Sequence, residues 1–485
     1  MNLRHALLVG TGVLLASPAF AQTGPAPIPP PVSVPTPGTP GAPRTLAGAL
    51  SETYGTQPAL RAERAKLRAT DEDVPQALSG WRPTVVLAGT AGYGNGITRS
   101  YNSLLFGWEK LPTERDVATA QATVTQPIYT GGRTQANVNR AKNTVFAERA
   151  TLIAQEESSF TDTVNAYVGV IQSQELLALN INNEQVLAKQ LEATNDRFRV
   201  GEITRTDVAQ AEAALSGATA QRQTAEGNLQ TARATFQRVV GYMPPGNLIE
   251  PQPLALPVHT EQQASAMAGS NNPTVIEALF NDAAAKDAVD AAFAQLMPQV
   301  SLQGQTFDQE NAGGRSAESN GYQVVAQVSV PLYQGGQEYS AVRQARQQQE
   351  QTSRLVADAK RTAVQAAVQA WETLDAARAA ATSTRSAIRA NQVALEGTER
   401  EAIVGSRTTL DVLNAQQALL NSRTTLVQNL AQVVTASYQV AAALGRLTAR
   451  DLHLSVPLYD DTAYYNAVKN KWFGLGDYAT NQPGR

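Results

Sequence analysis

The sequence predicts an α+β membrane protein that is built from two copies of one unit of helices and strands. Three observations support this fold class. The segment TVTQPIYTGGRTQANVNRAK, which starts at Thr123, is similar to QVSVPLYQGGQEYSAVRQAR, which starts at Gln327. Long stretches without proline follow both segments and show helical periodicity. Stretches of alternating polarity precede or overlap both segments, as in β-strands.

The similarity of the two segments extends along the chain as an internal duplication. Pro127 and Pro331 are separated by 204 positions, and Gly241 and Gly445 are separated by the same number. The separation is larger upstream of Pro83, which places a longer loop in the first copy, between Pro83 and Pro127. A constant separation over such a stretch indicates two structural repeats.

The N-terminus has the features of a secretory signal peptide. Arg4 provides a positive charge, residues 6–16 are apolar but too few to span a bilayer, and residues 19–21 (AFA) form a small-x-small cleavage site. We therefore expect residues 1–21 to be removed and the mature chain to leave the cytoplasm.

Five segments are expected along the chain. Nine prolines between residues 24 and 43 predict an extended, solvated linker after the signal peptide. The segments are the signal peptide (1–21), the proline-rich linker (22–45), repeat 1 (46–257), repeat 2 (258–451) and a C-terminal periplasmic tail (452–485).

Each repeat is expected to contain a long helical hairpin. No proline occurs between Pro127 and Pro244 or between Pro331 and Pro457, and both stretches are rich in residues that favour helix. At 1.5 Å per residue, the longer helix of each hairpin would extend about 100 Å, which is more than a globular core needs.

Two local signals mark the turn of each hairpin. A glycine suits the left-handed conformation in which helices often end. A threonine three residues later forms a capping-box pattern with an aspartate three residues further on. These residues are Gly201, Thr204 and Asp207 in the first repeat and Gly405, Thr408 and Asp411 in the second.

Four segments are predicted to be β-strands: 83–90, 118–127, 299–307 and 322–330. Polarity alternates along them, as it does along the strands of about ten residues that span a membrane. The alternative is a pair of soluble hairpins that pack on the helices. The export signal and the lack of an apolar run long enough for a transmembrane helix favour the membrane.

Four strands predict a shared barrel. They cannot enclose a lumen, since the smallest membrane barrels use eight strands, and open strand edges are not tolerated in lipid. Two chains would leave almost no lumen, whereas three would supply twelve strands and a wide passage. The geometry therefore predicts a homotrimer whose 12-stranded β-barrel continues into a tube of helices.

Composition argues against several other functions. The formal net charge is −3, so there is no basic excess for nucleic acid. Cysteine is absent, which removes disulfides and thiol chemistry, and His5, His259 and His453 are far apart. We expect no metal, no cofactor and no enzymatic activity.

Several paired motifs resemble the TolC-like outer-membrane efflux and secretion channels, the outer membrane factors. The motifs are QPIYTGGR and VPLYQGGQ, VGEITRTDV and VGSRTTLDVLNA, and VVGYMPP with its counterpart AALGRLT. The resemblance covers residues 46 to 455. It implies a trimeric exit duct with a 12-stranded β-barrel in the outer membrane and a long periplasmic 12-helix α-barrel. A periplasmic adaptor and an inner-membrane ABC or RND transporter would dock onto its tip.

The resemblance also implies a gate at the tip turn of the second repeat. The family pattern is an Arg, then an Asp, then often a second Asp three residues on. Arg407 and Asp411 fill the first two places, but Asn414 takes the third. Three copies of Asp411 would form a carboxylate ring that favours cations, with weaker cation block than in channels with two rings. The alternative is that Asp411, like Asp207, only caps its helix.

Two further features are assigned by position. Tyr129 and Tyr333 follow the strand-ending prolines and could belong to an aromatic belt at the membrane face or pack at the strand–helix junction. The tail from Tyr464 to Gly474 is similar to tails of family members that serve type I protein secretion, and it could equally form a segment packed around the helices.

The leading functional prediction is therefore a passive export duct, with type I protein secretion as its task and multidrug efflux as the alternative. A periplasmic coiled-coil adaptor is the alternative from another class of protein. Two equal repeats and four strands of membrane length speak against an adaptor.

Overall fold

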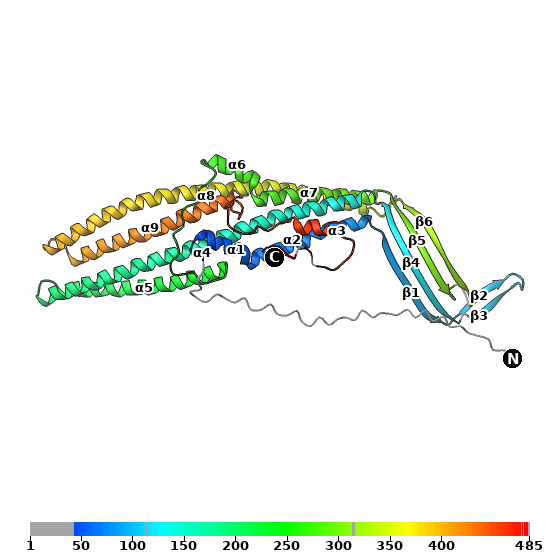
Figure 1. Ribbon diagram of the computed structural model, residues 1–485, viewed down its shortest axis with the longest axis horizontal. Coiled ribbons are helices and arrows are strands. Elements are labelled where there is room, and N and C mark those ends of the chain that lie inside the picture. The colour runs from blue at the N-terminus through cyan, green and yellow to red at the C-terminus, as the bar shows by residue number, and fades with distance from the viewer. Residues whose placement is uncertain (1–42, 113, 313–315, 477, 479, 484–485) are drawn as a thin grey trace.

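The computed structural model describes residues 43–112, 114–312, 316–476, 478 and 480–483. The predicted signal peptide (1–21) and residues 22–42 of the predicted linker lie outside the described residues. The rest forms an elongated molecule, with helices along most of its length and a β-sheet at one end (Figure 1).

Two long helical hairpins make up most of the molecule. In the first repeat, α4 (Arg133–Arg199, 67 residues) returns through α5 (Arg205–Val240). In the second, α8 (Gln337–Ile403, 67 residues) returns through α9 (Thr409–Ala443). Each 67-residue helix is about 100 Å long. These four helices confirm the prediction of two long hairpins. They run without a break because no proline interrupts them.

Shorter helices lie beside the long helices in the part of the molecule beyond the ends of the return helices (Figure 1). The first repeat contributes α1 (Leu46–Thr56), α2 (Pro58–Asp71), α3 (Asp73–Leu78) and the 3₁₀ turn η1 (Ser79–Trp81). The second contributes α6 (Glu261–Asn271), α7 (Pro273–Phe293) and η2 (Ala294–Leu296). The helix that begins at Pro58 breaks at Glu72, which separates α2 from α3. Pro75 has no backbone N–H to continue the hydrogen-bond ladder, which accounts for the break.

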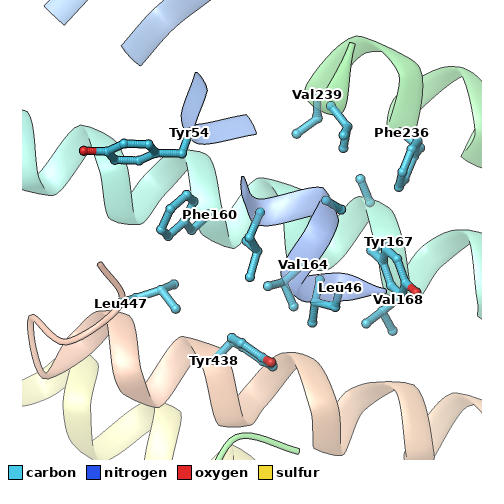
Figure 2. Close-up of a cluster of buried hydrophobic side chains, with 14 of the residues drawn as sticks. Leu46, Tyr54, Phe160, Val164, Tyr167, Val168, Phe236, Val239, Tyr438 and Leu447 are labelled. Carbon is cyan, nitrogen blue, oxygen red and sulfur yellow. The ribbon is translucent and has the colours of Figure 1, made fainter. Parts of the chain in front are cut away.

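The helices are joined where the first hairpin meets the second (Figure 2). Tyr167 of α4 packs against Phe236 of α5 with ring centroids 6.2 Å apart, and Phe160 of α4 and Leu447, which follows α9, belong to the same buried cluster. The Tyr167 hydroxyl lies 2.6 Å from the Arg44 carbonyl oxygen and 2.8 Å from the Ile249 carbonyl oxygen. This group of residues, here called the central cluster, lies about halfway between the sheet and the tips (Figure 1) and joins the two repeats.

The sheet combines strands of both repeats. Its strands are β1 (Thr84–Gly94), β4 (Arg115–Tyr129), β5 (Gln299–Glu310) and β6 (Glu318–Ser329), antiparallel in the order β1-β4-β5-β6. The four predicted strands are present at these places. β4 and β5 join the repeats, and β1 and β6 form the two edges.

Strand register separates the side chains onto two faces with different chemistry. One face, here called the apolar face, carries Val85, Leu87, Ala122, Val124, Leu302, Tyr322 and Val324. The opposite face, here called the polar face, carries Thr123, Gln121, Gln303, Gln305, Gln323 and Gln327. Facing pairs share a face, because side chains alternate along each strand.

The longer loop predicted in the first repeat contains a β-hairpin. β2 (Ile97–Asn102) pairs with β3 (Gly107–Pro112), and the hairpin projects beyond the end of the sheet (Figure 1). Tyr101 and Trp108 face each other across it, with ring centroids 5.6 Å apart. Phe106 lies at the turn with a left-handed φ of 52°. We expected a loop here, since turn-forming residues mask the alternation of these short strands.

Candidate functional site

The two hairpin tips form the end of the molecule that lies opposite the sheet (Figure 1). At each tip a helix of 67 residues ends, five residues turn the chain, and the return helix begins. The sequence-predicted site residues of both repeats therefore lie at the same end of the molecule.

Both tips are built by the predicted signals. Gly201 and Gly405 have φ values of 82° and 80°, which suit glycine. The Thr408 backbone N–H donates to Asp411 Oδ2 at 2.9 Å, the Thr408 hydroxyl donates to the same oxygen at 2.8 Å, and the Asp411 N–H donates to Thr408 Oγ1 at 3.3 Å. The turn is therefore closed by a reciprocal capping box.

The first tip has the same arrangement. The Thr204 backbone N–H and hydroxyl donate to Asp207 Oδ2 at 3.0 and 2.6 Å. Hydrogen bonds from Thr204 lower the pKa of Asp207, and those from Thr408 lower the pKa of Asp411. Both carboxyl groups are thus ionised at neutral pH.

Arg407 binds a residue that the sequence did not single out. Its Nε donates to Glu401 Oε2 at 2.9 Å, across the turn. The Glu401 carboxylate raises the pKa of Arg407, and Asp411 contributes less. Asn414 is exposed three residues after Asp411, so it lies about one helical turn further along α9. A single sequence offers no local pattern for the contact between Glu401 and Arg407.

Exposed apolar side chains accompany the charges at the tips. Val200, Ile403 and Val404 are 79, 77 and 79% exposed. Val200 and Val404 precede the turn glycines in the two repeats. The sequence located these turns from the glycines, and the exposure of the valines beside them is evident only in the structure.

The predicted interfacial tyrosines lie where the sheet meets the helices. Tyr129 ends β4 and is 46% exposed, and Tyr333 follows β6 and is 77% exposed. The register between β4 and β5 shifts at Pro127 and Tyr129, so a bulge turns the chain toward α4 there.

The C-terminal tail packs on helices of its own chain. Asp461 pairs with Arg149 of α4 at 3.5 Å, and the Tyr464 hydroxyl donates to Glu72 Oε1 at 2.9 Å. Arg82 Nη1 donates to the Lys471 carbonyl oxygen at 2.5 Å, next to the start of β1. The tail thus follows the helices toward the sheet.

The described residues offer little for other chemistry. No group of three or more His, Cys, Asp or Glu side chains in this part of the chain could hold a metal ion. No described helix has both the length and the apolar character that a membrane crossing needs.

Comparisons with known proteins agree with this architecture. The family model described as "Outer membrane efflux protein" matches residues 49–242 and 265–446. The outer membrane efflux protein BepC of Brucella suis is 37% identical over 435 residues, 89% of this chain and 92% of BepC. TolC of Escherichia coli is 25% identical over 419 residues, which cover 82% of this chain and 81% of TolC.

A third relative is named for secretion. The alkaline protease secretion protein AprF of Pseudomonas aeruginosa is 24% identical over 311 residues, 62% of this chain and 64% of AprF. The crystal structure of the outer membrane protein VceC of Vibrio cholerae superposes with a TM-score of 0.71 at 21% identity. It covers 82% of this chain and 96% of VceC, and this likeness shows the fold. The chain belongs to the outer membrane efflux protein family, and it is an outer-membrane channel rather than an enzyme.

Proposed function

We propose that three copies of the chain assemble into the exit duct of a tripartite export system, which conducts cargo passively from an inner-membrane pump and a periplasmic adaptor to the outside. The observation that carries this proposal is the sheet with two unpaired edges, β1 and β6. Open edges are costly in lipid, so β6 of one chain would pair with β1 of the next. Three sheets would close a barrel of twelve strands.

The exposed side chains of the apolar face support the membrane location of this barrel. Val85, Leu87 and Tyr322 are 72, 80 and 86% exposed. A contiguous apolar surface of this kind is unfavourable in water and favourable against lipid chains. Tyr129 and Tyr333 would then form part of an aromatic belt at the periplasmic face of the membrane.

The helices would form the periplasmic part of the duct. With four helices side by side from each chain, three chains would give a wall of twelve helices. The length of α4 and α8, about 100 Å, would carry this α-barrel far from the membrane. The adaptor would dock at its tip, where Val200, Ile403 and Val404 offer apolar contact area.

The tip of the second repeat would also hold the gate. In a trimer, three copies of Asp411 would form a ring of carboxylates that attracts cations. Because residue 414 is Asn rather than Asp, a second ring of carboxylates would be absent, so multivalent cations should block the duct only weakly.

We propose type I protein secretion as the task of the duct. AprF, a relative named for the secretion of alkaline protease, supports this task, as does the similarity of the tail. Multidrug efflux is the second candidate, because BepC is named as an efflux protein. A periplasmic adaptor is set aside, since the family is one of outer-membrane proteins.

Oxidative cross-linking tests the assembly. The chain lacks cysteine, so paired cysteines introduced on β1 and β6 react without background. We expect Val85→Cys, combined in turn with Tyr322→Cys, Val324→Cys or Val328→Cys, to give a ladder that ends at three chains for at least one pair. Val85→Cys with Val124→Cys is the control, because these residues face each other within one chain and should give no ladder. A ladder that ends at two chains, or no ladder from any β6 position, would contradict the trimer.

Deletion of the gene tests the cargo. Loss of exported proteins from the medium with unchanged drug sensitivity supports type I secretion. Increased drug sensitivity with an unchanged set of exported proteins supports efflux instead.

A further inference from the structure

Residues 469–476 of the C-terminal tail, here called the tail segment, lie at the end of the sheet where β1 begins. They follow the short helix α10 (Ala463–Val468). Arg82 Nη1 donates to the Lys471 carbonyl oxygen at 2.5 Å, and the guanidinium carbon of Arg82 lies 5.0 Å from the centroid of the Trp472 ring. Only Pro83 separates Arg82 from the first residue of β1. The tail segment therefore lies at the level where the chain passes from helix to sheet.

The tail segment is held at this level by contacts within its own chain. Val468, the last residue of α10, is buried. Tyr465 packs against the buried cluster that contains Val74 and Val145. The tail segment is thus anchored at its start by α10 and further along by Arg82.

The apolar side chains of the tail segment are open to their surroundings. Trp472 and Phe473 are 64 and 90% exposed, and Leu475 is fully exposed. Trp81, in the 3₁₀ turn that precedes β1, is exposed as well. Three large apolar side chains within four residues are unfavourable in water, so this patch indicates a binding surface.

The charge beside this patch is basic. Lys469 Nζ lies 5.5 Å from the centroid of the Tyr465 ring, and Lys471 Nζ lies 4.9 Å from that of Tyr478. Neither lysine forms an ion pair with an acidic side chain in the part of the chain that the structure describes. The next acid along the sequence, Asp477, lies outside the described residues. The tail segment itself therefore carries two positive charges and no negative charge.

Membrane lipid and the neighbouring subunit of the proposed trimer are the two partners that this patch could reach. The neighbour would bring its α8 to this edge, where Arg343 and Arg346 are exposed and Glu338 is buried. Two basic surfaces repel each other. Tryptophan is enriched at membrane–water interfaces, and anionic headgroups attract lysine. Charge complementarity therefore favours lipid.

We propose that the tail segment binds the periplasmic leaflet of the outer membrane. Trp472, Phe473 and Leu475 enter the region between headgroups and acyl chains, and Lys469 and Lys471 bind the phosphates of anionic phospholipids. This inference rests on the proposed function, because the sheet has to cross the membrane for the start of β1 to lie at its periplasmic face. Each chain then has a contact with lipid that is separate from the strands.

Lipid-borne quenchers test this contact in the full-length protein, which has no cysteine of its own. Bimane is attached to Phe473→Cys, and the protein is reconstituted in vesicles of phosphatidylcholine and phosphatidylglycerol that include nitroxide-labelled lipid. We expect the nitroxide to quench this bimane. Leu458→Cys is the control in the same tail and should keep its emission, because Leu458 lines a cavity with Tyr54 of the central cluster, away from the sheet. Val85→Cys, on the apolar face, reports whether the sheet lies in the membrane.

The double variant Lys469→Gln and Lys471→Gln tests the role of charge. Each lysine should raise the ratio of bound to free tail segments about fivefold, since a basic residue near an anionic surface contributes about 1 kcal/mol. We expect weaker quenching at Phe473→Cys in this double variant, and equally weak quenching of the parent when phosphatidylglycerol is left out. Lys469→Arg with Lys471→Arg retains the charge and should retain the quenching.

Three results would contradict the inference, and they are distinguishable. Quenching at Val85→Cys without quenching at Phe473→Cys would overturn it and leave the proposed function intact. No quenching at Val85→Cys would overturn the proposed placement of the sheet, and the inference with it. A disulfide between Leu475→Cys of one chain and Leu332→Cys of another, together with unquenched Phe473→Cys, would assign the patch to the neighbouring subunit. Leu332 is the matched position for this last test, since it follows β6 and is exposed.

Discussion

Arg197 and Glu401 occupy equivalent positions in the two repeats, 204 residues apart, and carry opposite charges. Each closes its own tip turn with an ion pair. Arg197 Nη2 lies 2.6 Å from Glu202 Oε1, and Glu401 Oε2 lies 2.9 Å from Arg407 Nε. The first turn thus presents an acid and the second presents a base.

The two ion pairs contribute little to the stability of the fold, and their main effect is to fix where charged groups lie at the tips. All four side chains are substantially exposed, and exposed pairs contribute about 0–1 kcal/mol and are screened by salt. The capping boxes close both turns in the same way, so the two tips differ mainly in electrostatics. This difference allows the proposed gate role of Asp411 to be tested separately from its capping role.

Asp411→Asn should reduce the preference of the channel for cations. Asparagine retains an oxygen that can accept the Thr408 N–H, so the cap is largely preserved while the carboxylate ring is removed. The reversal potential in asymmetric KCl measures the effect. Asp207→Asn is the matched control, since it changes the same kind of cap in the first repeat and should leave the selectivity unchanged. If both variants changed the reversal potential equally, Asp411 would have no role in selectivity beyond capping its helix.

Cation preference should be insensitive to pH over most of the physiological range. Hydrogen bonds from Thr408 hold the pKa of Asp411 below its ordinary value, so the carboxylate stays charged until the solution is strongly acidic. The same sign applies to the cap, whose stabilisation is present above the pKa of the unfolded chain and is lost as pH falls through the folded pKa. Reversal potentials should stay constant from pH 7 to about pH 4 and decline below it. Half-loss near pH 6 would contradict this expectation, and in the proposed trimer it would mean that three Asp411 carboxylates raise one another's pKa.

The sequence predicted the features that local chemistry determines. Gly405 and the capping pair of Thr408 and Asp411 each follow from a few neighbouring residues, and the structure places them as expected. The partnership of Arg407 with Glu401 depends on side-chain conformations across a turn, which no periodicity encodes. The tail contact of Lys471 with Arg82 joins residues 389 positions apart, beyond the reach of any local signal.

Assignment of the sheet faces also needed the structure. Alternation located the strands, but which side chains of the two repeats share a face depends on the pairing of Val124 with Gly304. A shift of one residue there would exchange every side chain of one repeat between the faces.

Tyr167→Phe should destabilise the central cluster and leave the structure of the tips unchanged. The hydroxyl lies within hydrogen-bonding distance of the Arg44 and Ile249 carbonyl oxygens, and its loss leaves them without this donor. We expect a loss of about 1 kcal/mol, seen as a lower melting temperature in detergent. Tyr438→Phe is the control in the same cluster, because no hydrogen bond of its hydroxyl is found among the described residues. Equal melting temperatures for the parent and Tyr167→Phe would contradict this role.

Glu157→Gln should stabilise the protein at alkaline pH. Glu157 is only 6% exposed, and its Oε1 accepts the Leu447 N–H at 3.2 Å, which ties α4 to the end of the second repeat. Burial raises the pKa of this carboxyl to about 8. The folded state then binds the proton more tightly than the unfolded chain does, so stability falls as pH rises from the ordinary glutamate pKa toward about 8.

Glutamine removes this dependence and retains an oxygen for the Leu447 N–H. The melting temperatures of the parent and Glu157→Gln should therefore be similar near pH 5 and should separate in favour of the variant as pH approaches 9. Glu157→Ala should be less stable than Glu157→Gln at both pH values, by about 1–3 kcal/mol, because it leaves a buried N–H unpaired. A parent protein that gains stability over the variant as pH rises would contradict the raised pKa and would mean that Glu157 is held as a carboxylate in the folded protein.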